Sequence, residues 1–183
     1  MPTESVFDGY TLRPPLPEEA EEYAHLLMTP DPEVDRLTGT TETFTHDAIV
    51  SYFTRNFADD TRQDFLILDP DSHIIGESVI NEIDFETRSA NFRIALFSSK
   101  DCSHGIGSWA VRKTVDYTFS ELHLHRLSLD VFSYNPRAKH VYEKAGFVQE
   151  GVLRDAVIDP ADGSYADDIL MSILEDEWHG RQA

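Results

Sequence analysis

The spacing of apolar residues changes near residue 97, and this change constrains the fold more than any other feature. Apolar and polar residues alternate from Ala90 to Phe97, as in a half-buried strand. Two apolar stretches, 65–68 and 74–83, precede it and flank the turn-forming residues Asp69-Pro70-Asp71-Ser72. This half of the chain therefore predicts an antiparallel meander.

Beyond this strand the pattern alternates between helix and strand. Apolar residues recur at helical spacing from Val111 to Leu122 and at strand spacing from Leu127 to Val131. Asn135-Pro136 suits the start of a second helix, and Gly146 suits its end. Two further strands are predicted at 147–158 and 165–174. A meander followed by such crossover helices predicts a mixed sheet with helices packed on it.

The first sixty residues predict a short strand and two helices. Prolines stop the strand at Tyr10–Arg13, and apolar residues then recur at helical spacing from Ala20 to Leu27 until Pro30 and Pro32. A second helix begins at Thr45, whose hydroxyl suits an N-cap. The core-facing residues expected on it are Ile49, Phe53 and Phe57.

Length and charge narrow the classes of function. The chain has 183 residues and no Gly/Ser/Pro-rich linker, so we expect one domain over residues 1–183. Its 15 basic and 34 acidic side chains give a formal charge of −19. Such a surface repels nucleic acids and anionic membranes. Without a long apolar run or a signal-like N-terminus, and with one cysteine, the chain predicts a cytoplasmic protein.

Two segments could carry chemistry. Gly105-Ile106-Gly107 lies where a strand gives way to a helix, and glycine there lets backbone amides approach phosphate oxygens. A tight turn explains these glycines equally well. Tyr142, on the helix after Asn135, fits a core position when taken alone. A zinc site is disfavoured, because the candidate ligands lack the usual paired spacing: Cys102, His104, His123 and His125.

The order of the motifs is more specific than any one of them. In sequence they are Ile75-Gly76, Arg88-Ser89-Ala90, Gly105-Ile106-Gly107, Leu124-His125-Arg126-Leu127, Asn135-Pro136-Arg137-Ala138, Tyr142-Glu143-Lys144-Ala145-Gly146-Phe147, Glu150-Gly151 and Tyr165 through Met171. Together they resemble the GNAT superfamily of acyl-CoA N-acyltransferases, closest to its ribosomal-protein and polyamine N-acetyltransferase branch. The resemblance implies an α+β fold with a central mixed, mostly antiparallel, twisted sheet and helices on both faces.

The resemblance also implies acetyl-CoA as acyl donor, no metal, and a role for each matching residue. The strand residues Ile94, Ala95, Leu96 and Phe97 would pair with the pantetheine arm. The loop residues His104, Gly105, Ile106, Gly107 and Ser108 would hold the pyrophosphate. Asn135 would hydrogen-bond the cofactor, and Tyr142 would protonate the leaving thiolate.

The chain departs from the family pattern at three positions. The family loop usually reads Arg/Gln-Gly-x-Gly-x-Gly/Ala, and here Cys102 and Ser103 replace its first two residues. The lost cation predicts weaker CoA binding, which nearby basic residues would partly offset: Lys100, Arg112, Arg137 and Lys139. Asn91 stands where related enzymes often carry Glu.

A general base is sought among the remaining acidic residues. Glu82 is the first candidate, acting through water from the central strand, although a surface carboxylate is an equally good interpretation. Glu77 is an alternative on the opposite strand face. Asp167 and Asp168 suit either an acidic position near the acceptor or a solvated hairpin turn.

The predicted activity is transfer of acetyl from acetyl-CoA to a primary amine by direct attack. By similarity we favour a protein N-terminal α-amine as acceptor. The alternatives are a polyamine or other small cationic amine, which the charge of −19 suits, and a non-catalytic CoA-binding module. A homodimer is compatible with the sequence.

Overall fold

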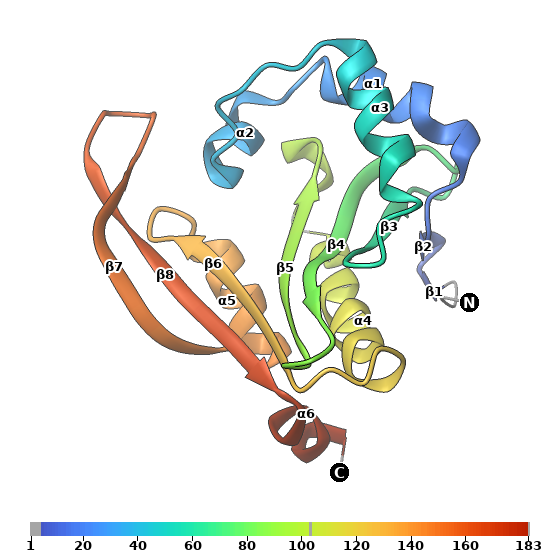
Figure 1. Ribbon diagram of the computed structural model, residues 1–183. Coiled ribbons are helices and arrows are strands. Elements are labelled where there is room, and N and C mark those ends of the chain that lie inside the picture. Colours follow the sequence, from blue (N-terminus) through green and yellow to red (C-terminus); the bar gives the residue numbers. More distant parts are fainter. Residues whose placement is uncertain (1–4, 103, 183) are drawn as a thin grey trace.

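Eight strands form a single mixed sheet in the order β1-β2-β3-β4-β5-β6-β8-β7 within residues 5–102 and 104–182, the part of the chain that the computed structural model describes (Figure 1). The strands are β1 Ser5–Phe7, β2 Tyr10–Arg13, β3 Gln63–Leu68, β4 Ile74–Asp84, β5 Ser89–Leu96, β6 Arg126–Phe132, β7 Val148–Ile158 and β8 Tyr165–Leu174. The β5–β6 pair is parallel, and the other described pairs are antiparallel. The predicted mixed, mostly antiparallel sheet is thus confirmed.

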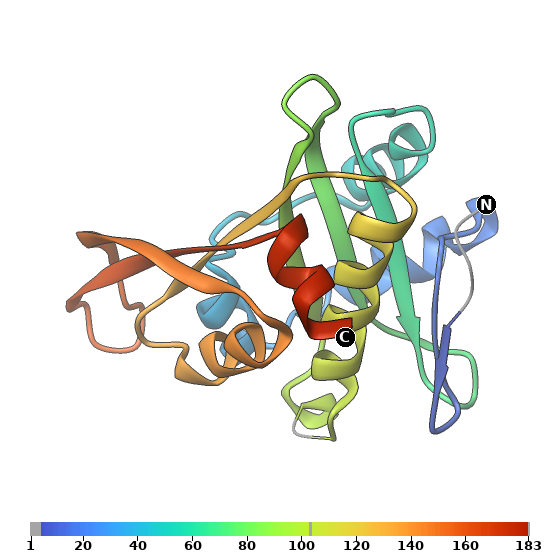
Figure 2. The same ribbon diagram turned by 90° about the horizontal axis from the view of Figure 1, so that it is seen from below.

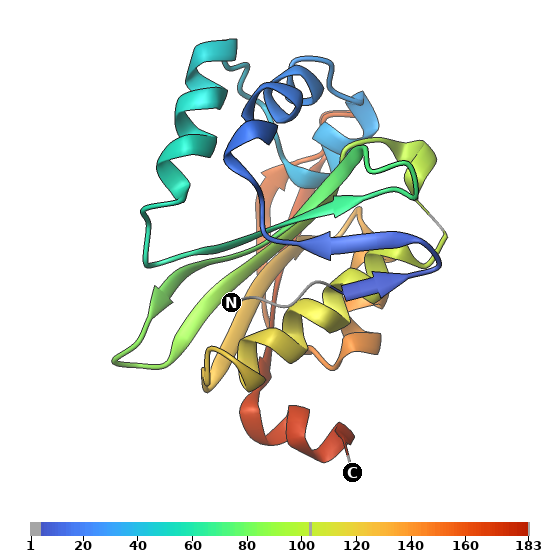
Figure 3. The same cartoon turned by 90° about the vertical axis from the view of Figure 1, so that its right-hand side faces the viewer.

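Helices cover both faces of this sheet, as predicted. The α-helices are α1 Ala20–Leu27, α2 Pro32–Thr38, α3 His46–Asn56, α4 Ile106–Ser120, α5 Pro136–Ala145 and α6 Glu175–Gln182, and the short 3-10 helices are η1 Pro17–Glu19 and η2 Ser99–Asp101. Figure 3 shows α1 and α3 on one side of the sheet and α4 on the other. Each side therefore has its own hydrophobic core.

Strand β3 shows how one apolar run serves both cores. Phe65 and Ile67 belong to the cluster under α4 and α5, whereas Leu66 and Leu68 belong to the cluster under α1 and α3. Successive side chains of a strand point to opposite faces, so a strand covered on both sides is apolar throughout. The unbroken run 65–68 follows from this position in the sheet.

The parallel pairing between β5 and β6 is short, and it ends in the middle of the sheet. The paired residues are Ser89 with Arg126, Ala90 with Leu127, and Asn91 with Ser128. Beyond Asn91 the two strands diverge, so the second half of β5 keeps one edge without a strand partner. This divergence positions the site described below.

Several predictions about the helices and strands need correction. Phe57 follows α3 and is 47% exposed, because it caps the helix beyond its buried face. Pro32, predicted to end a helix, instead begins helix α2, with Asp31 as N-cap and Gly39 in the left-handed conformation at its end. The sequence patterns also missed β1 and α6. Ser103 lies outside the described residues.

The last two strands form a long hairpin that projects from one end of the molecule (Figure 2). Asp167 and Asp168 lie within β8, and Asp168 is paired with Phe132 of β6 and Leu153 of β7, so their interpretation as part of the solvated turn is wrong. The turn itself is formed by residues 159–164. Within the part of the chain described, no helix has the length and apolar character needed to cross a membrane.

Candidate active site

A cleft of about 710 Å³ opens where β5 and β6 diverge. Its walls come from both sides of the sheet: Val34, Leu37 and Thr38 of α2 lie on one side, and the start of α4 with much of α5 on the other. The strand residues along it are Asn91–Leu96 and Asp130–Phe132. The cleft therefore passes through the sheet, and two molecules could meet in it from opposite faces.

The α4 side of the cleft offers backbone groups suited to an anion. Gly105 adopts the left-handed conformation (φ 82°) directly before α4, and no described side chain caps this helix start. The first-turn amides of a helix have no intrahelical partner and carry partial positive charge. The first turn also contains no acidic residue. These features suit a phosphate group.

The predicted cofactor residues divide into two groups. Seven line the cleft: Ile94, Ala95, Leu96, Gly105, Gly107, Ser108 and Asn135. Three do not. Ile106 is buried in the core, Phe97 packs edge-on against Tyr23, and His104 is exposed beside the cleft. The side chains of Ile106 and Phe97 are thus used in packing, and contacts with a ligand in the cleft would come from their backbone.

The basic residues along the cleft differ from those expected to offset the acidic charge. Arg137 lines the cleft as expected, but Lys100, Arg112 and Lys139 do not. Their place is taken by residues that the sequence analysis missed: Arg93, His140 and Lys144. Arg137, His140 and Lys144 follow one another at intervals of three and four along α5, which puts them on one helix face. Their mutual spacing of three and four residues along the predicted helix could have identified them.

Tyr142 lies where the two sides of the cleft meet. Its side chain is 8% exposed, and its ring packs against Phe92 and Phe147, with centroid distances of 6.3 and 5.9 Å. Burial raises the pKa of Tyr142 well above its ordinary value, and the carboxylate of Asp130 raises it further. The hydroxyl therefore keeps its proton at neutral pH and can donate a hydrogen bond within the cleft.

Two candidate bases are not brought into the cleft. Glu82 is exposed, lies in an irregularity of the β4–β5 pairing and has a φ of 54°. Glu77 accepts a hydrogen bond from the Tyr23 hydroxyl (2.7 Å) and forms an ion pair with Arg93 (3.2 Å). Glu77 is thus part of a packed polar network under α1, and Glu82 stays a surface residue in this structure.

A different pair of carboxylates, Asp130 and Asp168, lies on the α2 side of the sheet. Phe132 and Asp168 are opposite each other in the β6–β8 pairing, so their side chains share a face, and Asp130 points the same way two residues earlier. Burial raises the pKa of Asp168, and Asp130 raises it further. Oδ1 of Asp168 is buried and has no hydrogen-bond partner among the described residues. We call these two residues the acidic pair.

The histidines and cysteine considered as metal ligands do not form a cluster among the described residues. The group that does come together is Asp69, Asp71 and His73, whose ligand atoms lie within 4.8 Å of one another. It occupies the turn between β3 and β4, where Asp69 accepts hydrogen bonds from the backbone amides of Asp71 and His73. Turn formation accounts for this arrangement.

Comparisons with known proteins give the family. The family model described as an acetyltransferase (GNAT) domain matches residues 10–148. A spermidine N(1)-acetyltransferase of Vibrio cholerae is 30% identical over 135 residues, covering 74% of this chain and 76% of the relative. A putative ribosomal N-acetyltransferase of Bacillus subtilis is 30% identical over 113 residues, covering 61% of this chain and 60% of the relative.

The solved structures agree with this family. The crystal structure of spermidine N-acetyltransferase from Vibrio cholerae in complex with CoA and spermine superposes with a TM-score of 0.82 at 25% identity, covering 94% of this chain and 99% of that one. The chain therefore shares its overall fold with that enzyme. The chain belongs to the GNAT acetyltransferases, which transfer the acetyl group of acetyl-CoA to an amine.

Proposed function

We propose that this acetyltransferase acts on a small cationic amine of the polyamine class. The observation that carries the proposal is the acidic pair: Asp130 lines the cleft and raises the pKa of Tyr142, and Asp168 lies on the same face of the sheet, where Asp130 raises its pKa. Carboxylates in a partly buried site attract ammonium groups. The spermidine N-acetyltransferases among the relatives support the same acceptor class. A protein N-terminal α-amine, favoured from sequence, receives less support.

The cleft residues fit acetyl-CoA on the α4 side. The edge of β5 at Ile94–Leu96 offers backbone groups for the pantetheine amides, and Gly105, Gly107 and Ser108 offer amides for the pyrophosphate. Arg137 and Lys144 add positive charge along α5. Acetyl-CoA supplies a thioester, whose carbonyl carbon is open to attack by a neutral amine.

The acceptor must lose a proton before it attacks. An aliphatic ammonium has a pKa near 10, so the neutral form is scarce at neutral pH. The acidic pair holds the ammonium in place, and Asp168, whose pKa is raised by burial, accepts the proton. A bond from nitrogen to the acetyl carbon then forms, and the carbon–sulfur bond breaks.

Tyr142 acts on the leaving sulfur. Its hydroxyl, which stays protonated, donates a hydrogen bond to the developing thiolate. The amine loses one proton and the thiolate of CoA gains one to become the free thiol, so the reaction has no net change in protons. Positioning of the amine and stabilisation of charge supply most of the acceleration in such a reaction.

The test is a panel of acceptors offered to the purified protein with acetyl-CoA. Spermidine, spermine, putrescine and peptides with free N-termini are compared by thiol release and by the mass of the acetylated product. We expect the polyamines to be acetylated with the higher kcat/KM. Acetylation of peptides alone would overturn the proposed acceptor, and CoA binding without any turnover would identify a binding module.

A further inference from the structure

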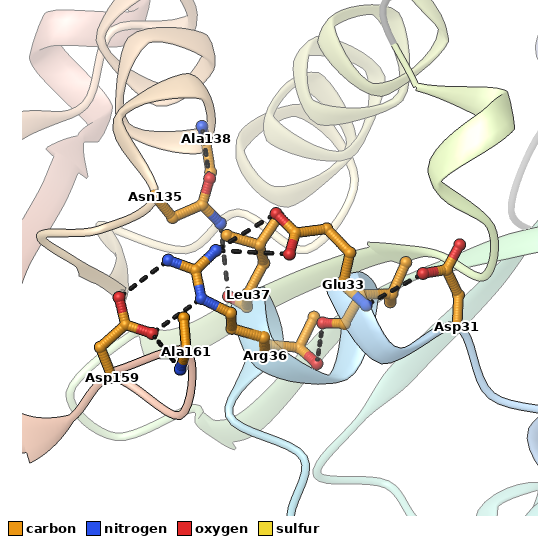
Figure 4. A network of polar contacts seen from close by, with 10 residues as sticks. Asp31, Glu33, Arg36, Leu37, Asn135, Ala138, Asp159 and Ala161 are labelled. Carbon is orange, nitrogen blue, oxygen red and sulfur yellow. Dashed lines mark hydrogen bonds and ion pairs between the residues drawn. The ribbon is translucent and has the colours of Figure 1, made fainter. Parts of the chain in front are cut away.

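Helix α2 lies across the cleft, and contacts fix it at its beginning and near its end (Figure 4). At its beginning, Asp31 accepts hydrogen bonds from the backbone amide of Ser99, beyond the end of β5, at 2.8 Å and from that of Glu33 at 3.0 Å. Near its end, the side-chain amide of Asn135 donates to the carbonyl of Leu37 at 3.3 Å. The helix thus joins the β5 side of the cleft to the α5 side.

Asn135 has a structural role in this arrangement. Its Oδ1 atom accepts a hydrogen bond from the backbone amide of Ala138 at 3.1 Å, which caps α5, while its Nδ2 atom donates to α2. Gly39 then lets the chain leave α2 in close contact with Phe132: a Cβ atom at position 39 would lie 2.8 Å from that ring. The end of α2 is therefore packed directly onto β6 beside the acidic pair.

An ion pair connects the middle of α2 to the turn of the β7–β8 hairpin. Arg36 donates from Nε and Nη2 to the two carboxylate oxygens of Asp159, at 2.7 and 2.8 Å, although the residues are 123 positions apart. Asp159 is only 8% exposed, and it also accepts from the backbone amide of Ala161. The guanidinium of Arg36 lies 5.1 Å from the ring centroid of Tyr134.

We propose that the Arg36–Asp159 pair is a latch that holds α2 and the hairpin turn together at the acceptor side of the cleft, and that Arg36 and Asp159 are positioning residues for the amine. The inference rests on the proposed function, since it assigns the α2 side to the acceptor. Two parallel hydrogen bonds fix the orientation of both partners, which a single contact would not do. Val34 and Leu37, which line the cleft, are held in place by the same helix.

The latch should influence binding of the amine acceptor more than binding of acetyl-CoA. The groups suited to the pantetheine and pyrophosphate of acetyl-CoA, on β5 and at the start of α4, belong to other elements. Asn135 does contact α2, but its cap on α5 through Oδ1 does not depend on that contact. The acceptor, by contrast, binds against α2, the acidic pair and the hairpin. A looser α2 should therefore weaken amine binding and leave the binding of acetyl-CoA nearly unchanged.

The experiment compares Asp159→Asn and Arg36→Gln with the wild type. Hydrogen–deuterium exchange is measured on the free protein, and KM is measured for acetyl-CoA and for whichever amine the wild type acetylates. We expect exchange in α2 and in residues 159–163 to rise about tenfold, and KM for the amine to rise about tenfold. KM for acetyl-CoA should change less than about twofold, and exchange in β4 should not change.

The matched control is Arg13→Gln. Arg13 and Glu19 form an ion pair of the same kind, with side-chain exposures of 21% and 11% against 22% and 11% for Arg36 and Asp159. Neither residue lines the cleft. This variant should have the wild-type exchange in α2 and the wild-type KM for the amine, so a similar response to that of the latch variants would overturn the proposal.

Three further results would overturn it: unchanged exchange in α2, unchanged KM for the amine, or an equal rise in both KM values. The exchange measurement needs no substrate. If the wild type acetylates no polyamine, the proposed acceptor class fails, while faster exchange confined to α2 and the turn still supports the latch. Arg36→Lys should be intermediate, because it keeps the charge but loses the paired donors.

Discussion

The two sides of the cleft are built from different kinds of sequence. The groups suited to acetyl-CoA come from one continuous stretch, β5 to α5, and many are backbone amides and carbonyls. The acceptor side combines α2, the acidic pair and the hairpin turn, and its ion pair joins residues 123 positions apart. In the proposed function, a donor common to the whole family is bound by local backbone geometry, whereas acceptor preference depends on side chains that only the tertiary fold brings together.

The largest effect is expected where the two sides meet. Tyr142→Phe should lower kcat about 100-fold, because the thiolate loses its hydrogen-bond donor. The affinity for CoA, measured by calorimetry, should stay within about twofold. Tyr117→Phe is the control, since the Tyr117 hydroxyl contacts Gln63 outside the cleft. An unchanged kcat in Tyr142→Phe would show that Tyr142 only packs in the core.

Neutralising the acidic pair should lower activity toward the amine acceptor without weakening CoA binding. Asp130→Asn combined with Asp168→Asn should lower kcat/KM for spermidine about 30-fold, since charge-assisted hydrogen bonds to the ammonium are lost. CoA affinity should be unchanged or slightly tighter, because negative charge is removed near a polyanion. Asp176→Asn, on the exposed face of α6, is the control for net charge. If kcat/KM fell equally for a peptide whose only amine is its N-terminal α-amine, a role of the acidic pair in recognising the polyamine cation would be contradicted.

A negative charge introduced at the start of α4 should weaken CoA binding, on the side of the cleft opposite the acidic pair. Apart from its chain neighbours and the backbone of its own helix, no described atom lies within 4 Å of a Cβ built on Gly107, so Gly107→Asp can be accommodated by the fold. An acidic residue in the first turn even stabilises a helix, so we expect the melting temperature to stay equal or rise. The Kd for CoA should nevertheless rise about tenfold through repulsion of the phosphates.

The control for this variant is Gly180→Asp in α6, where a Cβ also has open space. It adds the same charge to the same acidic protein, away from the cleft, so CoA affinity should change less than about twofold. Equal weakening in both variants would mean that overall charge, and not the helix start, controls CoA binding.

The smallest effect concerns pH. Burial and Asp130 raise the pKa of Tyr142 above its ordinary value, and a tyrosine is protonated at every pH below its pKa. Its proton is therefore present throughout the range from about pH 6 to pH 9. The kcat/KM for spermidine should rise with pH at low pH as Asp168, whose pKa burial raises, loses its proton, and Tyr142 should add no falling limb below about pH 9.5. A falling limb below about pH 9.5 that disappears in Tyr142→Phe would contradict this assignment.

The same contrast explains how much could be predicted from sequence. The β5 alternation, the glycines before α4 and the Asn135 cap are local signals, and each has the structure that its local chemistry favours. Helix α2 was missed because Pro30 and Pro32 resemble a helix stop, although Pro32 is its first residue and Asp31 its cap. The sequence predicts that loops near Arg36–Thr43 and Asp159–Gly163 shape the acceptor entrance, but it contains no sign of the ion pair between them.

The general base shows a similar limit. Glu82 lies on the predicted strand, but an irregularity in the β4–β5 pairing leaves its side chain exposed. The sequence marks Asp168 as one possible acidic position near the acceptor, but Asp130 looks like an ordinary polar strand position until the β6–β8 register puts the two residues on one face. Strand register is set by long-range pairing, so no local pattern could have brought these two carboxylates together.

A competition assay tests the central claim most directly. Spermidine and a peptide with a free N-terminus, at equal concentrations in one tube with limiting acetyl-CoA, are followed by mass spectrometry of both products. The account predicts that acetylspermidine predominates in the wild type and that its share falls in the Asp130→Asn, Asp168→Asn double variant. Predominance of the acetylated peptide in the wild type, or an unchanged product ratio in the double variant, would contradict it.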